Sequence, residues 1–154
     1  MVLKQPIALR QATGLKHVPA LKRVAGLFIA TWGIHTLDHA RRGLDDTTEA
    51  VVWAGTIVGL MAAVVITLIM VGHPTAPALA AAVFPSITFG VSASHMLPEW
   101  SALSDPLLVD SASDGWSVVA AGSEIVAAAI VGVVAIRILM RHDFRWRIDS
   151  VNWI

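Results

Sequence analysis

Histidines in apolar segments are the residues of this chain best placed to do chemistry. His35 and His39 lie four residues apart, and His95 lies in a separate apolar segment. Side chains four residues apart project from one face of a helix. Two imidazoles in that arrangement can chelate one metal ion. We therefore predict a metal site built on these three histidines, and we expect interfacial roles for the other three, His17, His73 and His142.

Two acidic residues in apolar segments extend this prediction. An ionisable side chain inside a membrane costs about 2.5–3.5 kcal/mol and persists where it is paired or lines a wet cavity. Glu124 would complete a four-ligand set of nitrogen and oxygen donors. Asp38 would be a further ligand, or would accept the second N–H of a histidine and fix its tautomer. Because the chain has no cysteine, the expected divalent ions are zinc, iron, manganese and copper.

The composition indicates the class of protein that holds these residues. Hydrophobic residues make up 56% of the 154 residues and charged residues 14%, whereas soluble domains carry about 25% charged residues. A chain with so little polar surface needs lipid around part of it. The net charge of zero gives no reason to expect a nucleic-acid partner. We predict an all-α integral membrane protein with the lipid bilayer as its first partner.

Four apolar segments predict a bundle of four transmembrane helices. The second segment has no charged side chain over more than the roughly 20 residues needed to cross the hydrocarbon core. A basic leader (1–23) precedes the bundle, and a basic, aromatic tail (141–154) follows it. The expected spans are 24–40, 50–71, 76–97 and 117–140, with one long loop over 98–116.

The distribution of lysine and arginine predicts the orientation. The leader holds five basic residues and no acidic one, and the tail is also rich in arginine. The long loop has four acidic residues and no basic one. Both termini should therefore be cytoplasmic, with the loop outside, in a bacterial plasma (inner) membrane. Arg41 and Arg42 would lie outside and count against this orientation, but they are outnumbered.

This orientation places the polar side chains at one depth. The first and third spans run outward and the fourth runs back, so His39, His95 and Glu124 all fall in the outer leaflet. At about 1.5 Å per residue, His35 and Glu124 each lie roughly 7–10 Å below the outer boundary. The long loop would then be either a lid over this pocket, with Glu99 and Asp105 at its mouth, or a solvated acidic segment. Arg41 and Arg42 could pair with these acids.

Three functions remain open from the sequence. The first is binding of a divalent metal, and any enzymatic activity would depend on that metal and act on an apolar substrate. The second is a proton-active or ligand-binding pocket of a transporter-like protein, although no ionisable partner lies in the inner halves of the spans. The third is a metal-free accessory subunit of a larger membrane complex, for which the small residues along the helices would provide packing surfaces. Self-association into a homo-oligomer is compatible with each of them.

Overall fold

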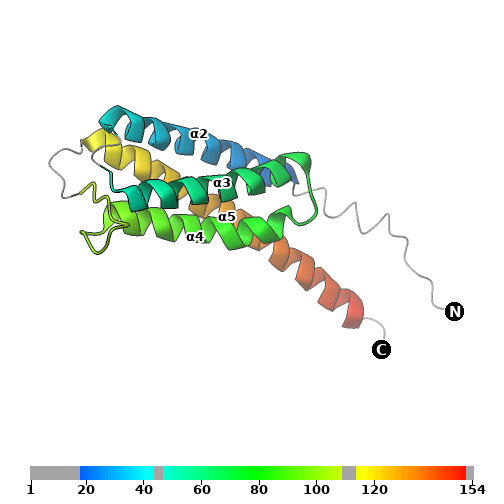
Figure 1. Cartoon of the computed structure of the whole chain (residues 1–154). Coiled ribbons are helices and arrows are strands. Elements are labelled where there is room, and N and C mark those ends of the chain that lie inside the picture. The colour runs from blue at the N-terminus through cyan, green and yellow to red at the C-terminus, as the bar shows by residue number, and fades with distance from the viewer. Residues whose placement is uncertain (1–17, 44–46, 109–113, 152–154) are drawn as a thin grey trace.

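The computed structural model describes residues 18–43, 47–108 and 114–151, with side chains for 19–43, 47–108 and 114–141. These residues form four helices that run alternately in opposite directions (Figure 1). The expectation of an all-helical chain is confirmed. The helices are α2 (Val18–Arg42), α3 (Glu49–Val71), α4 (Ala76–Met96) and α5 (Gly115–Val151).

Three of these helices are long and apolar enough to cross a membrane: α3, α4 and the part of α5 from Gly115 to Arg141. The first expected span, 24–40, lies within α2, which is not one of these three helices. Its polar residues, including His35 and Asp38, account for this lower hydropathy. Of the expected leader, residues 1–17 lie outside the described residues, and 18–23 form the first turns of α2. Residues 142–151 of the expected tail continue α5.

Local signals set both ends of α3. Thr48 precedes the helix with an extended backbone, and its hydroxyl accepts a hydrogen bond from the Val51 N–H, as an N-cap residue does. Gly72 follows the helix with φ at 73°, a left-handed conformation that favours glycine. The chain can therefore reverse within a few residues and start α4.

Small residues let α5 approach its neighbours closely. Ala121, Ala128 and Ala135 of α5 are completely buried, and α5 packs extensively against both α4 and α2. At Gly132 a side-chain Cβ would lie 3.1 Å from Cδ of Pro85, so a larger residue there would force Pro85 to shift by a few tenths of an ångström. The bundle is thus tightest where α5 meets α4.

The outer surface of the bundle is apolar, whereas several ionisable side chains are buried. On α2, Leu37 is 71% exposed and the adjacent Asp38 is only 1% exposed. On α5, Val126 is 58% exposed, whereas Glu124 is 4% exposed. This distribution is the reverse of the one expected in water, where charged residues are rarely buried.

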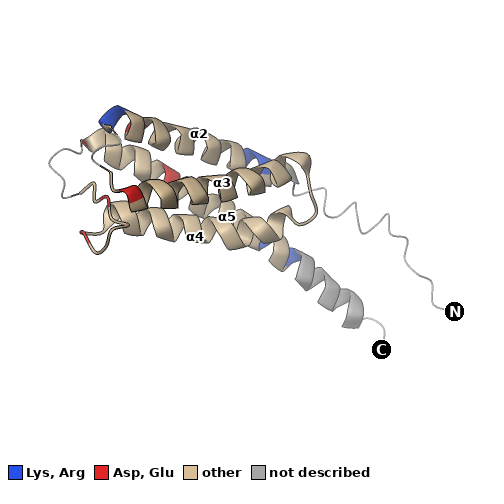
Figure 2. Cartoon of the chain, viewed as in Figure 1, with Lys and Arg blue, Asp and Glu red and all other residues tan. Residues whose placement is uncertain are grey.

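Charged side chains gather at the two ends of the bundle (Figure 2). At the end where α2 begins, the described charges are all basic: Lys22 and Arg23 on α2, and Arg137 and Arg141 on α5. The opposite end carries acidic residues together with Arg41 and Arg42. The ionisable residues predicted to form a site lie toward this second end.

Candidate metal centre

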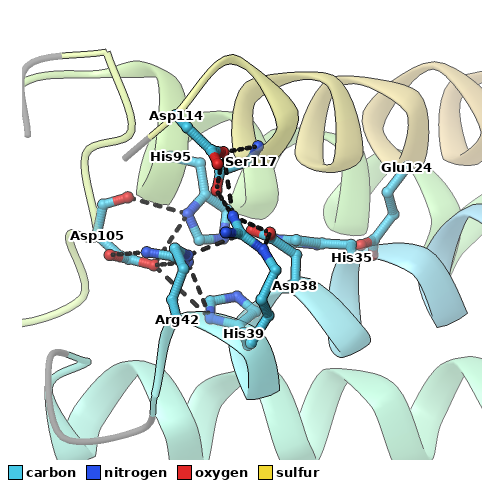
Figure 3. A network of polar contacts seen from close by, with 10 residues as sticks. His35, Asp38, His39, Arg42, His95, Asp105, Asp114, Ser117 and Glu124 are labelled. Atoms are coloured by element: carbon cyan, nitrogen blue, oxygen red, sulfur yellow. Dashed lines mark hydrogen bonds and ion pairs between the residues drawn. The ribbon is translucent and has the colours of Figure 1, made fainter. Parts of the chain in front are cut away.

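His35, His39 and His95 converge between the C-terminal ends of α2 and α4 (Figure 3). The ring of His35 lies 4.7 Å from that of His39 and 4.8 Å from that of His95, measured between centroids. One ring nitrogen from each residue can be chosen so that all three lie within 4.8 Å of one another. No other group of three or more His, Asp or Glu side chains with this property occurs among the described residues.

His35 contacts a carboxylate through one ring nitrogen and leaves the other ring nitrogen free. Its Nδ1 contacts Oε2 of Glu124 on α5, and both side chains are buried. The remaining nitrogen, Nε2, is buried and has no hydrogen-bond partner among the described residues. A histidine that binds metal through one nitrogen almost always donates its other N–H to an oxygen acceptor. The His35–Glu124 pair therefore has the arrangement of a metal ligand and its supporting carboxylate.

His95 is positioned by the backbone of the long loop. Its Nδ1 lies 3.0 Å from the carbonyl oxygen of Asp105, and the side chain is buried. The loop is fixed there because the Asp105 N–H donates to the carbonyl of Ser94 and the Leu107 N–H donates to that of His95. With Nδ1 donating to a carbonyl, Nε2 of His95 carries the free lone pair.

His39 is the most accessible of the three histidines, with 21% of its side chain exposed. Its Nδ1 lies 3.1 Å from Nη2 of Arg42 and 3.9 Å from Oδ2 of Asp105. In this geometry Arg42 donates to Nδ1, which places the His39 proton on Nε2, because Asp105 Oδ2 is beyond hydrogen-bonding distance. Metal binding through Nε2 would require the proton to shift to Nδ1 and the Arg42 guanidinium to move away from it.

The spacing of the histidines fits one ion after a small adjustment. Nitrogen ligands at about 2.0–2.1 Å from a tetrahedral ion lie roughly 3.3 Å apart. The three nitrogens lie within 4.8 Å of one another, so small movements of the imidazole rings would bring them to this spacing. The donor set is nitrogen alone, which suits zinc, copper and iron better than manganese.

Asp38 and Glu124, both predicted as ligands, do not belong to the three-residue group. The carboxylate of Asp38 is buried against two guanidinium groups, at 2.8 Å from Arg41 Nη2 and 3.3 Å from Arg42 Nε. Glu124 reaches the site only through His35. Asp38 therefore pairs with arginines, whereas Glu124 contacts a histidine of the group.

Arg42 links the end of α2 to the loop. Its Nη2 lies 3.0 Å from Oδ2 of Asp105, and each side chain is only 9% exposed. Burial alone would raise the pKa of Asp105, but the hydrogen bonds and charge of Arg42 outweigh it and hold this pKa below its ordinary value. The predicted pairing of an α2 arginine with an acid of the loop is confirmed. Arg41 makes a second such pair with Asp114.

Polar residues elsewhere on α2 and α4 do not reach the histidines. The hydroxyls of Thr31 and Thr88 bond to carbonyls of their own helices. His73 is exposed at the opposite end of the bundle, where its Nδ1 contacts the Thr75 hydroxyl. His17 and the side chain of His142 lie outside the described residues.

A groove between α2 and α3 leads to the site and was not foreseen from the sequence. It has a volume of about 440 Å³ and is lined mainly by apolar side chains. Phe28 and Trp32 of α2 lie at one end of its lining, and His35, His39 and Glu124 lie at the other. The helical spacing of Phe28, Trp32, His35 and His39 predicts that they share one face of α2. The separation of this face from α3, which forms the groove, is a tertiary property.

No family model, no curated protein and no solved structure matches this chain.

Proposed function

We propose that this chain is a four-span protein of a bacterial plasma membrane that binds one divalent metal ion through His35, His39 and His95, close to the outer face. The buried and unpartnered Nε2 of His35, with Glu124 on the opposite nitrogen, is the observation that carries this proposal. A buried polar atom without a partner is costly in any protein. A bound metal ion removes that cost at His35 and uses the two neighbouring imidazoles.

The surface of the bundle supports insertion of all four helices. The exposed faces of α3 and α5 carry large apolar side chains such as Val64 (61% exposed) and Val119 (60%). Exposed apolar patches of soluble monomers rarely exceed a few hundred Å². The outward-facing residues of α2 are also apolar, including Leu27 and Leu37. We therefore count α2 as a membrane span with its polar residues turned inward, which brings the number of spans to four.

Zinc, copper and iron are the preferred ions for a site of three imidazoles. Such a site leaves a further coordination position free for water or for a ligand. Glu124 would raise the basicity of His35 and hold its ring in place. A proton path across the membrane has less support, since the sequences of α2, α3, α4 and α5 carry no ionisable side chain between the histidines and the basic end.

Elemental analysis of protein purified without a histidine tag tests the metal site. We expect close to one ion per wild-type chain and none in a His35→Ala/His39→Ala variant. His73→Ala is the matched control, because His73 is exposed at the other end of the bundle, and it should keep the ion. Absence of metal from the wild-type protein after incubation with zinc, iron, manganese and copper would overturn the proposal and leave a metal-free pocket or subunit.

Cysteine labelling tests the membrane topology. The chain has no cysteine, so single substitutions give unambiguous sites. We expect a membrane-impermeant maleimide to label Glu99→Cys from the outside of intact cells, and to label His73→Cys only after the membrane is opened. The reverse pattern would invert the orientation without affecting the metal site.

A further inference from the structure

The groove between α2 and α3 has the shape of a chain-binding site. On α3 it is lined from Val51 to Ala63, a distance of about 18 Å at 1.5 Å per residue. A volume of about 440 Å³ spread over that length is a narrow trough. Its length and volume are sufficient for one extended hydrocarbon chain.

The two ends of the groove differ in polarity. The lining toward the basic end of the bundle is apolar and includes Phe28, Ala62 and Ala63. The lining toward the other end includes His35, His39 and Glu124, and the hydroxyls of Thr36 and Thr47. An elongated ligand that is apolar along its length and polar at one end would match both.

Two glycines of α3 line the groove and have different surroundings. At Gly59 a Cβ would lie 3.0 Å from Cζ2 of Trp32, so glycine lets the indole lie against α3. At Gly55 a Cβ would meet no atom within 4 Å. Gly55 is exposed and lines the groove, so the space beside it is open along the helix.

The side of the groove faces the surroundings of the bundle. Its lining includes exposed apolar residues, Val52 and Leu60 of α3 among them. In a membrane this opening would face the acyl chains of lipids. A hydrophobic ligand could therefore enter sideways, without passing through water or through the long loop.

We propose that the groove binds one fatty acid from the membrane, with its carboxylate head at His35 and His39 and its aliphatic chain along Trp32 and Gly55. The position of the head rests on the proposed metal function, because a three-histidine site leaves a coordination position that an oxygen ligand can take. The binding of the chain depends only on the groove.

Photolabelling with a diazirine derivative of palmitic acid, in lipid nanodiscs, tests this proposal. We expect the label on residues of the facing sides of α2 (28–39) and α3 (51–63), and excess unlabelled palmitic acid should compete with it. Gly55→Leu, which fills the groove away from the histidines, should lower the competed label about tenfold. Gly90→Leu adds the same side chain to an exposed position of α4 outside the groove and should leave the label unchanged.

Gly55→Ala adds only a methyl group and should lower the label partially, which keeps the test valid if the leucine variant does not fold. Label that is not competed, or that is equal in the Gly55 and Gly90 variants, would overturn the proposal. Elemental analysis of the same samples separates the two hypotheses. Competed label without bound metal would refute only the metal site, and bound metal without competed label would refute only the groove.

Discussion

The two contacts that α2 makes, with α5 on one side and with α3 on the other, differ in how closely the helices approach. Against α5, α2 is closely packed and joined by polar contacts, including His35 to Glu124 and Arg41 to Ser117 at 3.2 Å. Against α3, the packing is sparse and the groove separates the helices along much of their length. Glycine serves opposite purposes in the bundle. Gly132 allows α5 to touch α4, whereas Gly55 leaves space open.

The buried histidines are held firmly on one side and remain accessible on the other. The histidines are held from α5 by Glu124 and from the loop by the carbonyl of Asp105. The side toward α3 has no such contact among the described residues and provides the access. A binding site needs side chains that are held in place by neighbouring residues. It also needs one open side through which a ligand can enter.

The largest effect is expected from the removal of Arg42, the buried cation that joins α2 to the long loop. Arg42→Met would leave the buried carboxylate of Asp105 without its guanidinium partner. Removing one partner of a buried ion pair costs about 3–5 kcal/mol, and we expect the lower end because Arg41 still neutralises Asp38. Thermal unfolding in detergent should show a clearly lower midpoint. Lys22→Met, at the other end of α2, is the control, and an equal shift in both variants would contradict the role assigned to Arg42.

A direct comparison of two glycines tests the difference in packing. Gly132→Val would collide with Pro85 at the α4–α5 contact and should destabilise the protein by about 1–3 kcal/mol. Gly55→Ala meets no atom and replaces a poor helix former, so the free energy of unfolding should stay equal or rise by about 0.5–1 kcal/mol. Unfolding of both variants under one set of conditions measures the difference. Equal destabilisation would mean that the groove is closed in the folded protein.

Glu124 tests the support that α5 gives to the metal site. Glu124→Gln keeps the size of the side chain and removes its charge, which weakens the acceptor facing His35 Nδ1. Loss of such a supporting carboxylate typically lowers metal affinity about 10–100-fold. Competition with a chromophoric chelator would measure this loss. Unchanged affinity would show that Glu124 contributes only to folding.

The smallest effect is expected at the exposed start of α5. The backbone N–H of Ser117 donates to Asp114, and this bond, together with the nearby Arg41, holds the pKa of Asp114 below its ordinary value. A carboxyl group with a lowered pKa in the folded state stabilises that state at neutral pH, and this contribution is lost as the pH falls through about 4 and below. Asp114→Asn should therefore unfold at a slightly lower temperature than wild type at pH 7, and this difference should shrink as the pH falls below about 4. A difference that grows on acidification would contradict this assignment.

Much of the helical framework was predictable because it depends on composition and local signals. Long apolar runs predict α3, α4 and α5, and glycine and proline after Val71 predict the turn that follows. The four-residue spacing of His35 and His39 predicts their shared face, since helical periodicity is a local property. The shared level of His95 and Glu124 along the bundle, where both contact His35, was also predicted from residue counts along antiparallel helices.

Only the tertiary structure decided which of these polar residues meet. The sequence predicts Glu124 as a metal ligand and Asp38 as a ligand or as the acceptor of a histidine N–H. In the structure Asp38 faces the arginines at the end of its own helix and Glu124 faces His35. Their roles depend on the rotation of α2 against α5, which the packing of small residues at that contact sets. The groove is likewise a property of two helices together, because Gly55 leaves open space only if no residue of α2 fills it.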